Sequence, residues 1–391
     1  MFPEYFQFHN PTRVIFGKGI SSNFSPELDI IGKSKYFIIS DKIINDLGIV
    51  DTVIDGLKTE GIGISGVFLD IPQDAGLNAV KKCINEINSS DAEGIIAIGG
   101  GSVLDAAKVV NIVFTHGGDL VEDYSGAYTI TSGLKPLIAI PTTAGTGSEV
   151  TMAAVVHDEE NNEKIAFVDK YILPDMAILD PELTQTLPPS LTASTGMDAL
   201  SHAIESFVDN ECAPLTDMFT CGAVELIFNN IEKAVDNGND IDVRSAMMIA
   251  SCVAGICISH SQTGCVHGIA HNLGALYRVP HGEAIAIMLP HGMEYNLNHV
   301  SSKFARLARY MGVKTDGLNE KEAACEAINA VHSLVKRLHE RGVLPLRLRD
   351  VHVPRDGLMR VAEGAVSDGT SLYNPREIEP EELVKHLENA Y

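Results

Sequence analysis

Residues Gly196 to Glu205 read G-M-D-A-L-S-H-A-I-E, which places Asp198 and His202 four residues apart. On an α-helix this spacing puts both side chains on one face. A carboxylate oxygen and an imidazole nitrogen on one face can share a divalent cation when further ligands come from elsewhere in the chain. The stretch therefore predicts a helix that supplies part of a metal site.

Three histidines further along the chain can supply the remaining ligands. His267 and His271 repeat the four-residue spacing, and His281 lies between a proline and a glycine, in a sequence typical of a loop. A single buried histidine is more often a hydrogen-bonded core residue than a ligand. Taken with Asp198, the three histidines predict a metal site, but the spacing alone leaves open which of them bind the ion.

The first half of the chain alternates short apolar runs with helical patterns, which is typical of an α/β domain with a largely parallel sheet. The run G-I-I-A-I at 94–98 leads into G-G-G-S at 99–102, directly before a helical pattern. Glycines before a helix N-terminus let backbone N–H groups approach a pyrophosphate. Without further context, an ordinary flexible turn is an equally good interpretation.

These segments resemble the iron-containing (group III) alcohol dehydrogenase family. The resemblance extends from the run P-T-R-V-I-F-G-K-G, which begins at Pro11, to Asn374-Pro375-Arg376, and so covers nearly the whole chain. It implies an α/β, Rossmann-like N-terminal nucleotide-binding domain and an all-α C-terminal metal-binding domain, as in dehydroquinate synthase. The pattern changes from strands to helices near the proline pair at 188–189, so we expect domains at residues 1–186 and 187–391.

The resemblance also implies roles for individual residues. It implies that the metal ligands are Asp198, His202, His267 and His281, and that His271 is the catalytic residue beside the substrate and the nicotinamide. It implies cofactor contacts at Asp41, Gly99, Gly100, Gly101, Ser102, Asp105, Thr142, Thr143, Thr151, Lys164 and Leu183. For Lys164 and Leu183, a solvated surface lysine and plain apolar packing are the simpler interpretations.

Asp41 bears on the choice of cofactor because it follows the apolar run at 36–40. An acidic side chain at a strand end can accept hydrogen bonds from ribose hydroxyls and repels a 2′-phosphate. The alternative is an aspartate that caps the following helix. Together with the resemblance, Asp41 favours NAD(H) over NADP(H). The metal is expected to be Fe(II) or Zn(II), because imidazole and carboxylate ligands suit both ions.

The resemblance therefore implies a metal-dependent NAD(H) alcohol dehydrogenase or aldehyde reductase, in which the metal polarises the substrate oxygen and the nicotinamide carries the hydride. A lyase similar to dehydroquinate synthase is a second possibility. It needs several basic residues for a phosphorylated sugar, and the helical half has no obvious cluster of that kind. A non-catalytic metal-binding or nucleotide-binding module is the third, and the full ligand set argues against it.

Departures from the family pattern concern the substrate. The segment that contains Ile258, His260 and Gln262 is more polar than the family pattern, and Thr370 adds another hydrogen-bond donor. Leaving such donors unpaired costs about 1 to 3 kcal/mol each. We therefore expect a C2–C4 aldehyde or alcohol with a polar or anionic substituent, such as sulfoacetaldehyde. The alternatives are an unsubstituted alcohol or a propanediol or lactaldehyde type of substrate, with the polar side chains bonded to one another.

Composition limits the class of partner. The net charge of −23 argues against nucleic acid and anionic membrane surfaces as partners. The most apolar run, at 246–259, is too short to span a bilayer, the N-terminus lacks the layout of a signal peptide, and the seven cysteines form no pairing pattern. We expect a cytoplasmic protein. The strand-like segment Thr12–Phe16 resembles family segments that pair across a dimer, so a homodimer or higher homo-oligomer is expected.

Overall fold

The computed structural model describes residues 4–161 and 163–391. The described chain divides into two compact units: an α/β unit at residues 9–186, and a helical unit at residues 187–391 that also includes residues 4–8. The domain boundaries expected from the sequence place residues 4–8 in the first domain instead. We propose that these units are the two domains of the protein.

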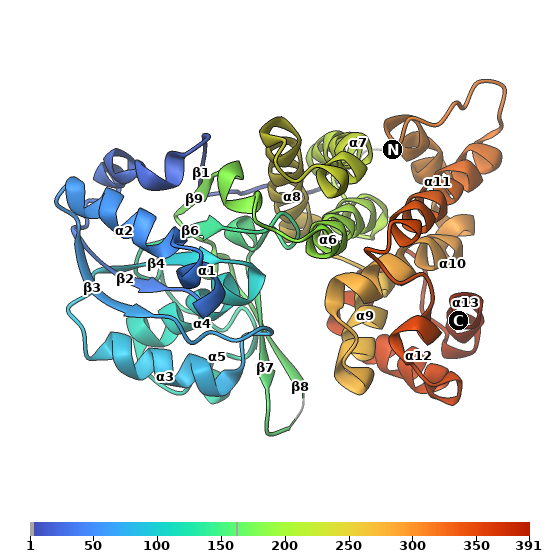
Figure 1. Cartoon of the computed structure of the whole chain (residues 1–391). Helices are drawn as coiled ribbons and strands as arrows, with labels where there is room; N and C mark the ends of the chain where they lie inside the picture. Colours follow the sequence, from blue (N-terminus) through green and yellow to red (C-terminus); the bar gives the residue numbers. More distant parts are fainter. Residues whose placement is uncertain (1–3, 162) are drawn as a thin grey trace. The chain divides into compact units, whose positions relative to one another are not determined.

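The α/β unit is built around a six-stranded sheet in which every described strand pair is parallel (Figure 1). Along the sheet the strands run in the order β1-β9-β6-β4-β2-β3. Their bounds are β1 Arg13–Phe16, β2 Lys35–Ile39, β3 Gly63–Phe68, β4 Gly94–Gly99, β6 Leu137–Pro141 and β9 Met176–Leu179. The parallel sheet confirms the predicted α/β architecture.

Both faces of this sheet are covered, because alternate residues of its central strands enter two separate apolar cores. Ile95 and Ala97 of β4 belong to one core, whereas Ile96 and Ile98 belong to the other. The helices of this unit are α1 Lys42–Asp46, α2 Ile49–Thr59, α3 Leu77–Asn88, α4 Gly101–His116 and α5 Leu120–Tyr124. A small second sheet contains β5 Gly126–Ala127, β7 Ala153–Asp158 and β8 Glu163–Val168.

The helical unit confirms the predicted all-α domain. Its helices are α6 Pro189–Val208, α7 Pro214–Asp236, α8 Ile241–Ser261, α9 Cys265–Tyr277, α10 His281–Tyr310, α11 Glu320–Glu340, α12 Leu358–Ser367 and α13 Pro380–Asn389. Helix α6 packs against α7, α8 and α10, and every residue from Gly196 to Val208 is buried. The stretch with the predicted ligands is therefore a central core helix of this unit.

Helix α8 is longer than the sequence indicated. The apolar run at 246–259 lies within a helix of 21 residues. The expectation that this segment is too short to span a bilayer was wrong, because the helix that contains it is long enough. Among the described residues, α8 is the one helix that is long and apolar enough to cross a membrane by those two criteria. It packs against α6 and α7, and a buried core helix meets the same criteria.

Candidate functional site

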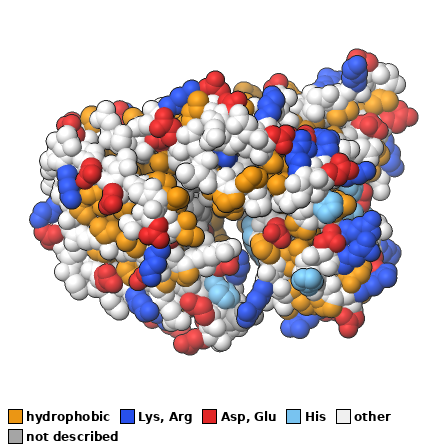
Figure 2. Space-filling view, in the orientation of Figure 1, with side chains coloured by type: hydrophobic (Ala, Val, Ile, Leu, Met, Phe, Trp, Pro, Cys, Tyr) orange, Lys and Arg blue, Asp and Glu red, His pale blue; other side chains and the backbone are white. Residues whose placement is uncertain are grey.

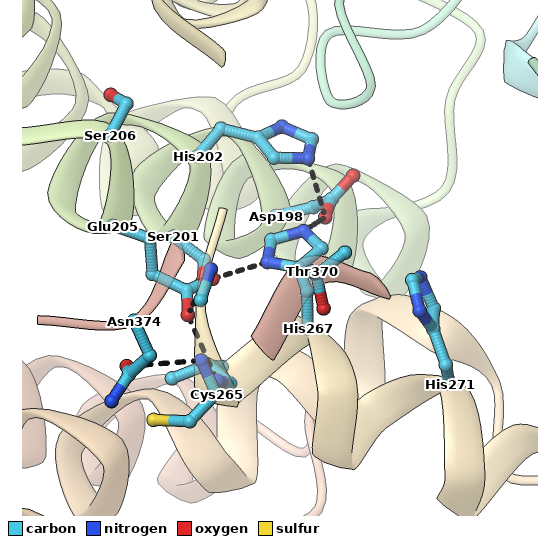
Figure 3. Close-up of polar contacts among 12 residues, drawn as sticks. Asp198, Ser201, His202, Glu205, Ser206, Cys265, His267, His271, Thr370 and Asn374 are labelled. Atoms are coloured by element: carbon cyan, nitrogen blue, oxygen red, sulfur yellow. Dashed lines mark hydrogen bonds and ion pairs between the residues drawn. The ribbon is translucent and has the colours of Figure 1, made fainter. Parts of the chain in front are cut away.

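The four predicted metal ligands lie together in the helical unit. Asp198 and His202 project from α6, His267 projects from α9, and His281 is the first residue of α10. The Oδ1 atom of Asp198 lies 3.7 Å from the Nε2 atoms of both His202 and His267. The Nε2 atom of His281 lies 3.4 Å from the same oxygen. Figure 3 shows the rings of His202 and His267 turned towards the Asp198 carboxylate.

The donor set fits a divalent cation. Asp198 Oδ1 and His267 Nε2 are buried without a hydrogen-bond partner, although a buried polar atom left unpaired costs about 1 to 3 kcal/mol. Four ligand atoms at zinc-like distances in a tetrahedron lie about 3.4 Å from one another. The separations between Asp198 and the three imidazoles, 3.4 to 3.7 Å, are close to that value.

Glu205 orients one of these imidazoles. Its carboxylate is bonded to Nδ1 of His267, and it also accepts the backbone N–H groups of Gly264 (3.1 Å) and Val266 (2.8 Å) at the start of α9 (Figure 3). Such a carboxylate fixes the ring and leaves Nε2 for a metal. Sequence reasoning missed Glu205, although Asp198, His202 and Glu205 are spaced by four and three residues along one helix face.

The electrostatics of the cluster favour a positive charge at its centre. Burial acts to raise the pKa of Asp198, but the surrounding His202, His267 and His281 hold that pKa well below its usual range. Burial acts to lower the pKa of His267, yet Glu205 and Asp198 raise it to about 10. Two carboxylates therefore stabilise a positive charge on this imidazole. A proton or a metal ion at Nε2 supplies that charge.

His271 belongs to a separate hydrogen-bonded group. Its Nδ1 atom lies 2.9 Å from a carboxylate oxygen of Asp368, just after α12. Asp368 also accepts the backbone N–H and the hydroxyl of Thr370, at 2.9 and 2.6 Å. Burial acts to raise the pKa of Asp368, but the bond to His271 helps hold that pKa below its ordinary range. Asp368 was missed because no sequence pattern connects it with His271.

Two of the expected substrate residues, Thr370 and His260, make hydrogen bonds to other atoms of the protein. Thr370 donates its hydroxyl to Asp368, as described above. On α8, His260 Nδ1 lies 2.8 Å from the carbonyl oxygen of Ile256, and its ring stacks on Phe8 with centroids 4.3 Å apart. Ile258 lies on the same helix, and Gln262 follows its end with a φ of 66°. For His260 and Thr370, internal bonding is therefore the better interpretation.

The glycine turn of the α/β unit is tightly built. Gly99 ends β4, and Gly100 directly precedes α4. A Cβ atom on Gly101 would lie 2.6 Å from the side chain of Thr146, and one on Gly99 would lie 2.6 Å from Val103. No side chain larger than hydrogen fits at these two positions without a shift, which keeps the backbone before the α4 N-terminus bare for an anion.

Asp105 and Ser102 of α4 hold neighbouring loops in place. The Asp105 carboxylate accepts the hydroxyl of Ser148 at 2.6 Å and the backbone N–H of Val155 at 3.0 Å. Ser102 Oγ accepts the backbone N–H of Asp74 at 3.0 Å. The structure therefore gives both predicted cofactor residues a part in positioning the loops around the turn.

The threonine loop is held by a buried lysine that sequence reasoning missed. Lys108 Nζ donates to the carbonyl and the hydroxyl of Thr151, both at 2.9 Å, and to the carbonyl of Ala153 at 2.8 Å. Burial lowers the pKa of Lys108 to about 8. Thr142 is buried and bonded to Gly99 through its backbone N–H, and Thr143 lies beside Gly100. Thr142, Thr143 and Thr151 thus lie on a loop anchored to the turn and to α4.

The remaining predicted cofactor residues have structural contacts of their own. Asp41 follows β2 at the same edge of the sheet as the glycine turn, and its Oδ1 atom caps α1 by accepting the N–H of Ile44 at 2.9 Å. Lys164 lies 3.4 Å from Asp74. Leu183 is buried in an apolar core. Helix capping for Asp41, an ion pair for Lys164 and apolar packing for Leu183 are therefore contacts that these residues make within the protein.

Known proteins resemble this chain over its whole length. Residues 11–181 match the family description "Iron-containing alcohol dehydrogenase", and residues 192–391 match "Fe-containing alcohol dehydrogenase family, C-terminal". The 1,3-propanediol dehydrogenase of Citrobacter freundii is 35% identical, with 99% of both chains covered. The lactaldehyde reductase of Escherichia coli (strain K12) is 35% identical, with 96% of this chain and 97% of that protein covered.

A solved structure shares the fold. The sulfoacetaldehyde reductase of Bifidobacterium kashiwanohense, in complex with NAD⁺, superposes with a TM-score of 0.87 at 28% identity and 99% coverage of both chains. The matches span both the glycine turn and the aspartate–histidine cluster. The chain therefore belongs to the iron-containing alcohol dehydrogenase family and is an oxidoreductase.

Proposed function

We propose that the protein interconverts small aldehydes and alcohols, with NAD(H) as the hydride carrier and a divalent metal, Fe(II) or Zn(II), held by Asp198, His202, His267 and His281. The observation that carries this proposal is the meeting of three imidazole Nε2 atoms around one oxygen of Asp198, at 3.4 to 3.7 Å. The named activities of the two relatives above, which both concern small alcohols or aldehydes, support it.

The chain's own residues prepare the reaction. When bound, the ion supplies a Lewis acid for the substrate oxygen. Glu205 holds the His267 ring by its Nδ1 atom, so that Nε2 faces the Asp198 oxygen. Asp368 similarly engages Nδ1 of His271, which leaves Nε2 of that ring to take up or release the substrate proton. The burial of Asp198, His202 and His267 keeps bulk water away from the charges.

The choice of NAD(H) rests on the α/β unit. The bare glycine turn before α4 suits a pyrophosphate, and Asp41 stands at the end of β2, where a carboxylate favours ribose hydroxyls over a 2′-phosphate. The cofactor named for the sulfoacetaldehyde reductase structure, NAD⁺, supports the same choice.

For the substrate, we propose a C2–C4 aldehyde or alcohol that carries a hydroxyl or an anionic group. The relatives named for lactaldehyde, 1,3-propanediol and sulfoacetaldehyde support this size and polarity. The internal bonds of His260 and Thr370 reduce the support from those two residues. The buried hydroxyl of Ser371, next to Thr370, lacks a hydrogen-bond partner and is a donor that a polar substrate group can satisfy.

A kinetic comparison tests this proposal. The metal-loaded enzyme is assayed by NADH absorbance with propanal, lactaldehyde, succinic semialdehyde and sulfoacetaldehyde, and with NADPH in parallel. We expect the highest kcat/KM for a polar aldehyde with NADH. A preference for propanal would contradict the polar substituent, equal efficiency with NADPH would contradict the role of Asp41, and no turnover of any aldehyde or alcohol would contradict the function.

We also propose a homodimer or higher homo-oligomer located in the cytoplasm, with no nucleic-acid or membrane partner. Strand β1 lies at the edge of the sheet, and its residues Val14 and Phe16 are 40% and 42% exposed. An apolar sheet edge is usually covered, and a second copy of the chain is one way to cover it. Light scattering at micromolar concentration should give at least twice the mass of the chain, and a monomer mass would exclude the assembly.

A further inference from the structure

A second group of histidines surrounds a glutamate elsewhere in the helical unit. Glu294 and His291 lie on α10, His332 lies on α11 and His386 lies on α13. His291 is ten residues from His281, which is about 15 Å along the helix. The metal centre proposed above uses none of these four residues.

The distances within this group are short. His332 Nε2 lies 2.8 Å from one oxygen of Glu294, and His291 Nδ1 lies 3.3 Å from the other. His386 Nδ1 lies 3.8 Å from that second oxygen, beyond hydrogen-bond length. The ligand atoms of His291, Glu294 and His332 all lie within 4.8 Å of one another. Side chains from three helices thus present nitrogen and oxygen atoms to one small volume.

Hydrogen bonds alone leave this group incomplete. The Nδ1 atom of His386 is buried without a hydrogen-bond partner. Its ring is packed edge-on against Tyr295, with centroids 5.5 Å apart, and the Tyr295 hydroxyl is itself bonded to the carbonyl of Glu377. A cation among the four side chains would give the Nδ1 atom of His386 a partner. Imidazole nitrogens with one carboxylate are ligands typical of Zn²⁺ and similar first-row ions.

Solvent can reach the group. A cavity of about 240 Å³ is lined by His291 and His332, and the side chains of Glu294 and His332 are 33% and 36% exposed. In Figure 2, histidine side chains also reach the surface of the helical unit. Arg347 lines the same cavity and opposes a cation, which favours moderate rather than very tight binding.

We propose that His291, Glu294, His332 and His386 form a second divalent-metal site, which takes Zn²⁺ or a similar nitrogen-preferring ion. The ion would join α10, α11 and α13, and so fasten the last helix of the chain to the long helix that begins with His281. The residues of this site are separate from those of the proposed catalytic metal site. The ion here would have a structural role, whereas the ion at the other site would have a catalytic one.

Metal counting tests the proposal. The full-length protein is stripped with a chelator and dialysed against micromolar Zn²⁺, and bound zinc is measured by atomic emission. We expect two equivalents of bound zinc per chain in the wild type, and one equivalent per chain in Glu294→Gln and in His332→Gln. His299→Gln is the matched control, because His299 is an exposed residue of α10 outside the group, and it should retain two. His267→Ala should retain one equivalent, at the second site.

Thermal melting gives a second measurement. Zn²⁺ should raise the Tm of His267→Ala but not that of the double variant with Glu294→Gln. Two equivalents of zinc in both Glu294→Gln and His332→Gln would mean that the second equivalent is an adventitious ion only, and would overturn the second site. One equivalent in the wild type with none in His267→Ala would also overturn it, while leaving the catalytic metal centre intact. One equivalent in both proteins would support the second site and contradict the catalytic assignment.

Discussion

At the scale of single residues, the proposed metal centre depends on a carboxylate outside the proposed ligand set. Glu205 accepts the backbone N–H groups of Gly264 and Val266 and is bonded to Nδ1 of His267. The same side chain therefore fixes the start of α9 and the orientation of a ligand that this helix carries. Its negative charge also favours a cation at the other nitrogen of the ring.

Glu205→Gln should weaken metal binding without removing a ligand. The amide keeps the size of the side chain but loses the charge that orients and polarises His267, so metal affinity should fall about 10- to 100-fold. Competition with a chelator of known affinity measures this. Ser201→Ala is a control, since Ser201 contacts the same carboxylate at 3.4 Å and supplies no ligand. Unchanged affinity in Glu205→Gln would contradict the orienting role.

Glu149 should make stability depend on pH. Burial raises the pKa of Glu149 to about 7, against an ordinary value of 4.5. Between these two values the folded state binds more protons than the unfolded state, so the free energy of unfolding falls as the pH rises through this window. The stabilisation, about 3 kcal/mol, is fully present below pH 4.5 and is lost as the pH rises to 7.

The comparison with Glu149→Gln isolates this residue. Glutamine stays neutral throughout, so the Tm of the wild type should fall relative to that of the variant as the pH rises from 4.5 to 7. Lys108, whose charge acts in the opposite direction on the pKa of Glu149, is present in both proteins. Parallel Tm curves over this range would contradict a neutral buried Glu149.

At the scale of helices and strands, the proposed metal centre depends on how closely α10 approaches α6. A Cβ atom on Gly282 would lie 2.7 Å from the backbone oxygen of Ser194, one helical turn before Asp198. Since His281 precedes Gly282, the close contact of these backbones sets the position of the fourth proposed ligand. Backbone atoms cannot give way as a flexible side chain can.

Gly282→Ala should therefore lower metal affinity while all four ligands remain. The added methyl group moves the start of α10 away from α6, and with it His281. Gly222→Ala on α7 is the control, because nothing lies within 4 Å of its Cβ position. We expect retained helical circular dichroism in both variants and reduced bound metal only in Gly282→Ala. Equal metal content in the two variants would contradict this account of the helix junction.

The same scale explains what the sequence could predict. The four-residue spacing of Asp198 and His202 predicted the helix that carries two of the proposed ligands, and the alternation of apolar runs and helices predicted the parallel sheet. The same spacing argument applies to Glu205, which follows His202 by three residues. Asp368 could not be predicted in this way, because it is 97 residues from His271 and only the packing of α12 against α9 brings the two residues together.

Side-chain direction was the other obstacle to prediction. The departures from the family pattern at His260 and Thr370 predict substrate contacts, but the hydrogen bonds to Ile256 and Asp368 show where these side chains are engaged. Lys108 carried no signal as a buried residue, since a lysine is most often exposed. Its burial follows from the loop carbonyl groups that it satisfies.

At the scale of the whole molecule, each candidate site is built within one of the two units. The four proposed metal ligands all belong to the helical unit, and the glycine turn with Asp41 and the threonine loop belongs to the α/β unit. Metal binding should therefore not require the nucleotide, whereas turnover requires both. This separation makes the metal dependence of turnover the most direct test of the central claim.

The decisive measurement is NADH oxidation by a small polar aldehyde after the metal is removed and returned. The stripped wild-type enzyme should be inactive and should regain activity with Fe(II) or Zn(II). Loss of a ligand in His267→Ala should lower activity by about 100-fold or more even with added metal, while His299→Gln should behave as the wild type. Full activity in the stripped enzyme, or in His267→Ala, would contradict the account.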